Sequence, residues 1–365
     1  MAATPHPAVR RSIVPPYLLA RLARVDDPRF AVAADAARQS LLTDVPLRGI
    51  REGEPPAHPR RGAMPAPDRE PGLPQRWISD AAGLEILPGR LVRSEGNPAT
   101  GDPAVDEAYD GLGHTHALFW TQFGLDSIDG VGLPLEASVH YGHHYDNAFW
   151  DGRRMVFGDG DGEVFTRFTA SLSVIGHELA HGVIQYSANL PYQGQSGALN
   201  ESISDVFGAL VEQHALGQDV ASASWLIGEG LFTDQVEGRA IRSMKAPGTA
   251  YDDDVLGTDP QPASMDGYID TDEDNGGVHL NSGIPNRAFY LVADALGGNA
   301  WEAAGHIWFD TVMRDDLPTT VDFAGFARAT IEVAAERHGA GSREADAVVV
   351  AWESVGVLLP AERSE

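Results

Sequence analysis

Apolar residues follow two different periods along this chain of 365 residues. Between residues 76 and 170, short apolar runs alternate with turn residues, which is typical of strands and hairpins. We predict strands at 76–83, 91–96, 137–142 and 154–168, with one helix at 103–124. From residue 171 the period is helical, and the predicted helices are 171–187, 199–216, 287–297, 301–314, 321–338 and 342–354. The pattern indicates an α+β fold of two lobes, β-rich at 76–187 and α-helical at 188–365, joined by the helix at 171–187.

The first 75 residues differ in composition from the rest of the chain. Leu18, Leu19 and Leu22 form an apolar stripe that predicts a short helix, within a segment that we place at residues 1–50. Residues 51–75 are rich in proline, glycine and charged residues, which is the composition of a linker. We expect a detachable N-terminal segment; the alternative is a loop within one domain.

His177, Glu178 and His181 form the pattern His-Glu-x-x-His inside the predicted helix at 171–187. Because positions i and i+4 of a helix lie on one face, the two imidazoles can hold one Zn²⁺. Glu178 then lies beside the metal and can accept a proton from a water that the metal activates. The same pattern also occurs by chance in long helices, so a third ligand is needed to distinguish a zinc site from a chance match.

Glu201 supplies a candidate third ligand, 20 residues after His181, in a second predicted helix. Glu201 and Asp205 share one face of that helix. One carboxylate can bind the metal, and the other can accept the free N–H of a ligand histidine. Taken alone, this segment could equally be an acidic helix N-terminus; the combination with His-Glu-x-x-His favours a zinc site.

The composition excludes some classes of ligand and partner. The chain has no cysteine, so nitrogen and oxygen atoms must hold the zinc and no disulfide can form. With 53 acidic and 26 basic residues, the net charge of −27 argues against nucleic-acid binding. The excess of carboxylates serves solubility or, in part, Ca²⁺ binding.

The sequence also predicts no membrane anchor. It has no apolar run of 18 residues or more, so we expect no transmembrane helix. The N-terminal residues lack the apolar stretch and cleavage site of an ordinary secretory signal. We expect secretion by another route, with an intracellular location as the alternative.

Two other groups of residues qualify as metal candidates but are assigned other roles. Asp-Gly-Asp-Gly at 159–162 begins like a Ca²⁺ loop, yet no glutamate follows at the twelfth position, so we predict a tight turn between strands. Five histidines are predicted to be ordinary polar or core residues, because the single pair with i, i+4 spacing, His140 and His144, lies in a predicted strand: His114, His116, His140, His143 and His144.

Several separate motifs make residues 76–358 resemble the thermolysin family of neutral zinc metalloproteases. They are YDNAFWDG at 145–152, FGDGDG at 157–162, HELAH at 177–181, GALNESISD at 197–205, RSM at 242–244 and DNGGVHLNSGIPN at 274–286. Pro-Pro-Tyr at 15–17 is similar to the short propeptide of the protealysin-type subgroup. That resemblance implies a propeptide that covers the active site as an intramolecular inhibitor and is removed by proteolysis, here by self-cleavage in the linker near Gly49–Ile50.

The resemblance implies a role for each residue that matches a motif. The zinc ligands would be His177, His181 and Glu201, and the general base Glu178. Asp205 and Asn200 would orient the two ligand imidazoles. His279 and Tyr192 would stabilise the oxyanion, with Asp274 orienting His279. The substrate main chain would be held by Asn147, the backbone of Ala148 and Arg242.

The resemblance also implies a substrate pocket and fewer calcium sites. The pocket for the residue just after the cut bond would be lined by Phe165, Phe168, Val174, Ile227, Leu231 and Ile241, which predicts a preference for Leu, Phe, Ile or Val. Possible calcium ligands are Glu212, Asp219 and Glu229. Ser173, Leu226 and Arg239 stand where relatives have acidic ligands, so we expect one Ca²⁺ or none and a weak dependence of stability on calcium.

These features predict a monomeric zinc endopeptidase, made as a zymogen, that cuts peptides on the N-terminal side of bulky apolar residues. One alternative is an aminopeptidase of a related zinc fold, which would need an acidic anchor for a free α-amine. The other is a catalytically silent zinc-binding or adhesion protein. The presence of Glu178, Tyr192 and His279 argues against a silent protein.

Overall fold

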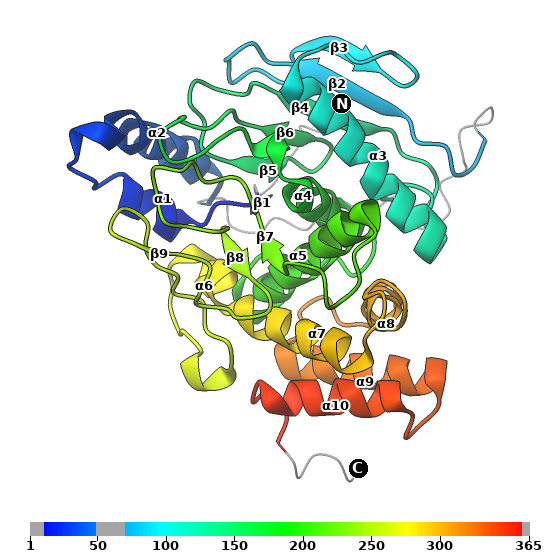
Figure 1. Ribbon diagram of the computed structural model, residues 1–365. Helices are drawn as coiled ribbons and strands as arrows, with labels where there is room; N and C mark the ends of the chain where they lie inside the picture. Colours follow the sequence, from blue (N-terminus) through cyan, green and yellow to red (C-terminus); the bar gives the residue numbers. More distant parts are fainter. Residues whose placement is uncertain (1–10, 49–69, 360–365) are drawn as a thin grey trace, which may run out of the picture.

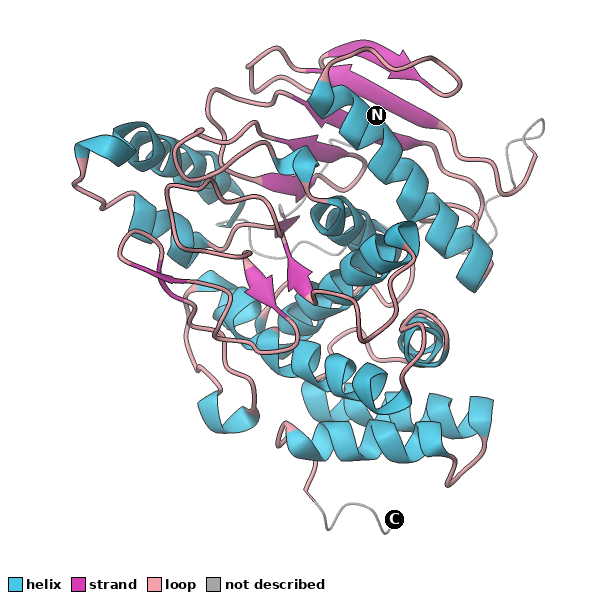
Figure 2. Cartoon of the chain, viewed as in Figure 1, coloured by secondary structure: helices cyan, strands magenta, loops and turns pink. Residues whose placement is uncertain are grey.

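The computed structural model describes residues 11–48 and 70–359, without the side chains of 45–48. A mixed sheet lies at one end of the molecule and a group of helices at the other, with two long helices crossing between them (Figures 1 and 2). The predicted α+β fold of two lobes joined by a central helix is confirmed. Among the helices of the described residues we find no candidate for a membrane-spanning segment.

The main sheet has six strands in the order β1-β5-β6-β4-β2-β3. These strands are β1 (Arg11–Ser12), β2 (Arg76–Asp80), β3 (Arg90–Ser94), β4 (Leu135–Val139), β5 (Ala148–Trp150) and β6 (Met155–Phe157). β4 pairs in parallel with β2 and β6, and the other pairs are antiparallel. Two small two-stranded sheets pair β7 (Leu226–Ile227) with β8 (Arg242–Ser243), and β9 (Asp252–Asp253) with β10 (Gly257–Thr258).

Helices make up most of the remaining structure. The N-terminal lobe contains α3 (Pro103–Phe123), which begins at the capping carboxylate of Asp102 and ends at left-handed Gly124. The two helices between the lobes are α4 (Leu172–Gln185) and α5 (Gly194–Leu216). The C-terminal lobe adds α6 (Asp274–Asn281), α7 (Gly283–Leu296), α8 (Ala303–Val312), α9 (Phe323–His338) and α10 (Arg343–Ser354). Single 3₁₀ turns lie at Pro28–Phe30, Phe168–Ala170 and Met265–Gly267.

The structure corrects three local predictions. The strand pair predicted at 154–168 is wrong beyond β6, because the Asp161 carboxylate accepts backbone N–H groups of the following residues and holds them in an irregular turn. The segment around His279, for which the apolar period predicts no helix, contains α6, which includes a left-handed stretch at 275–277. The helix predicted to begin at residue 199 begins at Gly194, since its first turn carries no apolar stripe that the pattern could show.

The N-terminal segment packs against both lobes. It contains β1, α1 (Pro16–Leu22) and α2 (Ala31–Arg48), separated by the turn at Pro28–Phe30. Arg21 of α1 donates to the backbone oxygens of Asp254 and Val255 in the C-terminal half of the chain. The backbone N–H of Ala33 in α2 donates to Glu163 in the N-terminal lobe. Most of the predicted linker at 51–75, and the predicted cut near Gly49–Ile50, lie outside the described residues.

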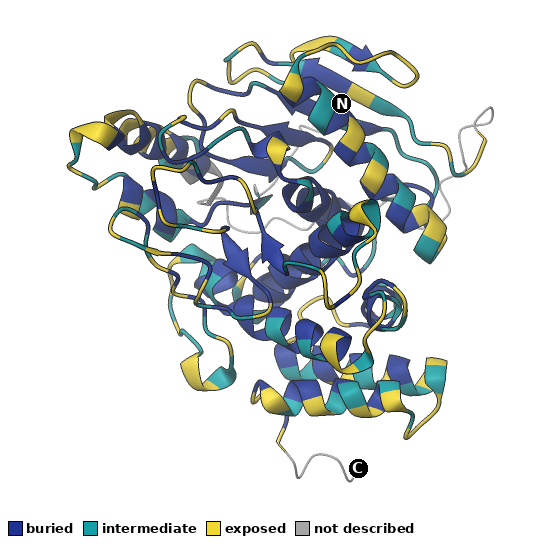
Figure 3. Cartoon of the chain, viewed as in Figure 1, coloured by how far each residue is buried: buried dark blue, intermediate teal, exposed yellow. Residues whose placement is uncertain are grey.

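A glycine contact sets the distance between α4 and α5. A methyl group on Gly208 would lie 2.4 Å from the carbonyl oxygen of Ser173 and 3.0 Å from the backbone nitrogen of His177. A methyl group on Gly176 would lie 3.0 Å from the Cα of Gly208. Both helices are buried over most of their length (Figure 3). The two backbones therefore touch where they cross, and no larger residue fits at this point.

We expect Gly208→Ala to lower the free energy of unfolding by about 1–3 kcal/mol, because the added methyl meets backbone atoms that cannot rotate away. Urea unfolding measures the loss. Gly325→Ala is the matched control, since its methyl meets only side-chain atoms of Val321 and Asp322. Equal stability of the two variants would contradict the close crossing.

His140 connects three parts of the N-terminal lobe. It follows β4, its Nε2 lies 3.0 Å from Asp102 at the start of α3, and its Nδ1 lies 2.9 Å from Asp159 in the turn after β6. The hydrogen bond to Asp159 raises the pKa of His140 to about 9 although burial opposes the rise, and Asp102 adds to the effect. The charged imidazole therefore stabilises the folded state.

The pKa of His140 is about 9 in the folded chain and about 6.5 when unfolded, so this contribution is complete below about pH 6.5 and is lost as pH rises through about 9. We expect His140→Asn, which tolerates the φ of 55° at this position, to lower the free energy of unfolding more at about pH 6 than at about pH 10. Urea unfolding at both pH values tests this, with exposed His143→Asn as the control. A loss that is the same at both pH values would refute the role of the charge.

Candidate active site and metal centre

The imidazoles of His177 and His181 lie one turn apart on α4 and face α5. Both side chains are fully buried. The Nε2 of His177 lies 3.6 Å from Oε2 of Glu201, and the Nε2 of His181 lies 3.3 Å from Oε1 of the same carboxylate. The spacing of four residues along one helix, and the crossing of the second helix, bring these three side chains together.

Each imidazole is oriented through its other nitrogen. Nδ1 of His177 donates to Asp205 at 2.7 Å, and Nδ1 of His181 donates to Asn200 at 2.8 Å. Asn200 is itself held by the backbone oxygen of Leu190. These bonds fix the tautomer in which Nε2 of both rings carries a free lone pair.

The residues fit a zinc ion. Nε2 of His177, Nε2 of His181 and Oε2 of Glu201 are buried and have no hydrogen-bond partner. Donor atoms of the three residues lie within 4.8 Å of one another, and no other such group of three exists among the described residues. Two imidazoles and one carboxylate are a donor set of catalytic zinc sites, which leave one position for water.

Glu178 lies next to this group without being part of it. Both of its carboxylate oxygens are buried and lack a hydrogen-bond partner. Burial, and then the charge of Glu201, raise the pKa of Glu178 well above its usual range. Its place beside the metal-binding group suits a carboxylate that takes a proton from water and returns it.

Tyr192 and His279 face the metal-binding group from its other side. Nδ1 of His279 is bonded to Asp274 at 2.7 Å, and the Tyr192 hydroxyl lies 3.1 Å from Nε2 of His279 and donates to Glu201. Burial alone would lower the pKa of His279, but the negative charges of Asp274 and Glu201 raise it to about 9. Both side chains are thus hydrogen-bond donors at neutral pH.

Arg242 is fully buried and held in place by a carboxylate. Its Nε and Nη2 each donate to Asp205 at 2.8 Å. Asp205 therefore contacts both His177 and Arg242, and it also accepts a bond from Asn286 at 2.8 Å. The remaining nitrogen of the guanidinium, Nη1, points to the N-terminal segment.

Residues 11–14 of the N-terminal segment lie across these groups. Nε2 of His279 donates to the carbonyl oxygen of Ser12 at 2.8 Å, and Nη1 of Arg242 donates to that of Ile13 at 2.9 Å. The N–H of Ile13 donates to the carbonyl oxygen of Ala148 at 3.1 Å. The N–H of Val14 donates to the side chain of Asn147 at 2.9 Å. The groups expected to hold a substrate main chain hold this segment instead.

The six residues expected to line the substrate pocket are all buried: Phe165, Phe168, Val174, Ile227, Leu231 and Ile241. They belong to the same continuous apolar cluster as Ile13, which is also fully buried. Gly228 lies beside Leu231 and Ile241, where an added methyl would come within 3.1 Å of each. The expected pocket residues and Ile13 are therefore all part of the buried apolar core.

The expected calcium ligands do not form a three-ligand group among the described residues. Burial, and then the charge of Glu229, raise the pKa of Glu212 to about 6. The Asp219 carboxylate accepts from Ser222 instead. The hydroxyl of Ser173, at a position where the family resemblance led us to expect an acidic ligand, accepts the N–H of Gly228. Calcium binding here stays a prediction.

Three residues that hydrogen-bond to the site residues were not predicted from the sequence. Ser204 lies 2.9 Å from Nδ1 of His181, Asn286 binds Asp205, and Gln261 donates to the backbone oxygen of His279 at 2.7 Å. Ser204 could have been found, because it follows Asn200 by four residues on one helical face. Asn286 and Gln261 come from distant segments and carry no such signal.

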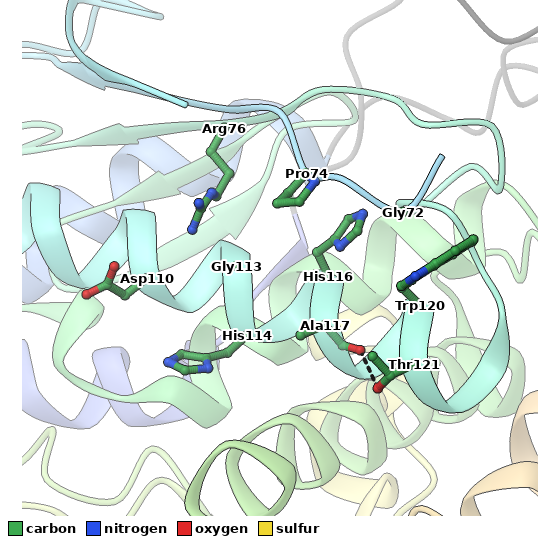
Figure 4. Close-up of a pocket in the computed structure, with 10 residues that line it drawn as sticks. All are labelled: Gly72, Pro74, Arg76, Asp110, Gly113, His114, His116, Ala117, Trp120 and Thr121. Atoms are coloured by element: carbon green, nitrogen blue, oxygen red, sulfur yellow. Dashed lines mark hydrogen bonds between the residues drawn. The ribbon is translucent and has the colours of Figure 1, made fainter. Parts of the chain in front are cut away.

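A separate surface pocket of about 360 Å³ lies on α3 (Figure 4). Its lining includes His114, His116 and Trp120, and a methyl group on Gly72 would clash with the Trp120 ring. His116 lies 3.6 Å from the buried carboxylate of Asp126. None of the lining residues belongs to the metal-binding group or its partners, so this pocket is not the catalytic site.

Comparison with known proteins agrees with the geometry. The family model described as "Thermolysin metallopeptidase, catalytic domain" matches residues 80–185. The model "Thermolysin metallopeptidase, alpha-helical domain" matches residues 188–357. The two matches meet between α4 and α5, where the metal-binding group lies.

Individual relatives share both lobes. The chain is 51% identical over 353 residues to an extracellular metalloprotease of Pectobacterium carotovorum subsp. carotovorum, covering 96% of this chain and 97% of that protein. It is 37% identical over 287 residues to thermolysin of Alicyclobacillus acidocaldarius subsp. acidocaldarius, covering 76% of this chain and 50% of that protein.

A solved structure extends the likeness to the N-terminal segment. The precursor of protealysin, a metalloproteinase from Serratia proteamaculans, matches with a TM-score of 0.85 and 51% identity, over 95% of this chain and 100% of that chain. With the two family matches and the buried zinc-binding group, the chain belongs to the thermolysin family of metallopeptidases, as a zinc endopeptidase whose short N-terminal segment fits the protealysin-type subgroup.

Proposed function

We propose that the chain is a zymogen, in which residues 1–50 inhibit an endopeptidase that cuts before bulky apolar residues. The observation that carries this proposal is the position of Ser12, Ile13 and Val14, whose main-chain atoms bond to His279, Arg242 and Asn147. The family resemblance assigns Asn147 and Arg242 to the substrate main chain and His279 to the oxyanion. A segment that occupies them excludes any other peptide.

The residues of the site support one mechanism of peptide hydrolysis. Zn²⁺, when held by His177, His181 and Glu201, supplies a Lewis acid that acidifies water and polarises the peptide carbonyl. Glu178 accepts the proton of the attacking water and passes it to the leaving amine. His279 and Tyr192 donate to the oxygen on which negative charge develops, each worth about 2.7–4 kcal/mol in a comparable oxyanion site.

Other residues position the substrate. Arg242, aligned by Asp205, holds the carbonyl after the cut bond, and Asn147 holds the next main-chain N–H. The backbone of Ala148 pairs with the extended peptide as a neighbouring strand would. This geometry favours an endopeptidase over an aminopeptidase, since the chain of the N-terminal segment continues on both sides of the site.

The proposal also covers the zinc ligands, the oligomeric state and the location of the protein. Asp205 and Asn200 orient the zinc ligands. The protein acts as a monomer on peptide and protein substrates, and it is exported, since the Pectobacterium relative is named as extracellular. The precursor named among the solved structures supports synthesis as a zymogen.

We expect Glu178→Gln to keep one zinc per chain and to lower peptide hydrolysis by at least about 10²-fold, because the amide cannot take a proton from water. Elemental analysis and casein hydrolysis measure the two properties. Exposed Glu237→Gln is the matched control, and 1,10-phenanthroline should abolish hydrolysis by the unmodified protein. Full activity of Glu178→Gln would remove the mechanism.

We expect Leu231→Phe to disfavour large side chains after the cut bond, because the larger ring fills part of the pocket. The ratio of kcat/KM for peptides with Phe and with Val at that position should fall about tenfold. Leu216→Phe, at an exposed position on α5, is the control. An unchanged ratio would show that Leu231 does not line this pocket.

A further inference from the structure

The contacts of the N-terminal segment block the active site, and they also show which of its peptide bonds is aligned with the catalytic groups. Ser12 supplies the carbonyl that His279 binds, and Ile13 supplies both the N–H paired with Ala148 and the carbonyl bound by Arg242. β1 pairs antiparallel with β5, with Arg11 opposite Trp150 and Ser12 opposite Phe149. The peptide bond between Ser12 and Ile13 therefore lies where a substrate's cut bond would lie.

The side chains agree with this register. Ile13 is the residue just after that bond, it is fully buried, and its class is the one that the apolar pocket prefers. Val14 is fully buried as well, and Ser12 is small and 6% exposed. Arg11 donates to the backbone oxygen of His181 at 3.2 Å. Arg11 and Ser12 are extended in β1, and the chain then bends at Ile13 and Val14 before Pro15 caps α1.

We propose that the Ser12–Ile13 bond is itself a substrate of the site, so that the chain cuts its own inhibitory segment there in addition to the linker. This inference rests on the proposed function. Water adds its oxygen to the Ser12 carbonyl carbon while Glu178 takes its proton. The C–N bond breaks and Glu178 passes that proton to the Ile13 nitrogen; the new carboxyl group then gives its own proton to the amine, so that the products are a Ser12 carboxylate and an Ile13 ammonium group.

The two products are held unequally. Residues 13–44 keep the bonds to Arg242 and Asn147, the bonds of Arg21 to Asp254 and Val255, and the bond from Tyr145 to Asp44. On the other side, the described contacts are those of Arg11 and Ser12. Release of residues 1–12 would thus free the positions that Arg11 and Ser12 occupy, while the remaining segment still covers Arg242 and Asn147.

The first experiment follows the intact masses of the full chain over time. We expect loss of residues 1–12 in the unmodified chain and in Ile13→Leu, at a rate independent of protein concentration because the bond is already bound. Glu178→Gln should show no cut, and Ile13→Asp should slow it at least about tenfold, because the apolar pocket disfavours a charge. A chain that hydrolyses casein but keeps Ser12–Ile13 intact overturns the inference; a chain that hydrolyses neither refutes the proposed function instead.

The second experiment tests the register without catalysis. A fluorescent peptide containing Arg-Ser-Ile-Val is titrated into full-length Glu178→Gln, alone and combined with Ile13→Asp. We expect the double variant to bind the peptide at least about tenfold more tightly, because the charge expels residue 13 from the pocket. Glu178→Gln with Leu42→Asp, at an exposed position on α2, is the control, and thermal unfolding confirms that each variant is folded. Equal affinities in all three chains would overturn the inference.

Discussion

The rest of the active site depends on the hydrogen bonds and ion pair that the buried carboxylate of Asp205 makes. It lies on α5 and binds His177 of α4, Arg242 of β8 and Asn286 of α7. Burial alone would raise the pKa of Asp205, but the charge of Arg242 outweighs it and lowers the pKa to about 2. Because a buried charge left without its partner costs about 3–5 kcal/mol, none of these elements can move independently.

The same kind of support appears elsewhere in the site. Groups that contact a peptide are held from behind by buried partners: Asp274 holds His279, and Asp205 holds Arg242. Donors fixed in this way need no reorganisation when charge develops on a bound carbonyl. The close crossing of α4 and α5 at Gly208 adds a steric constraint to these electrostatic ones. Rigidity therefore comes from two independent sources, backbone contact and charge pairing.

Site residues could be predicted from the sequence where the helical periodicity places them on one face of a helix. The spacing of His177 and His181 by one helical turn, and that of Glu201 and Asp205, is enough to assign each pair to a shared helical face. Prediction failed where the information is tertiary. The irregular turn at 158–167 depends on the carboxylate of Asp161, and Gln261 reaches His279 from a distant loop. The path of residues 11–14 through the cleft was implied only by family resemblance, because two strand residues give no readable pattern.

The pairing of β5 with the edge strand β1 has a consequence for substrate choice. β1 is the last strand of the sheet, so the partner of β5 is replaceable, and whatever replaces it must be extended. Main-chain hydrogen bonds to such an edge carry no information about sequence. A substrate segment must therefore first be locally unfolded so that it can pair with β5, and it must then carry one apolar side chain at the pocket. Compact folded proteins, whose segments already have strand or helix partners, are consequently poor targets, whereas loosened or damaged chains present many acceptable sites.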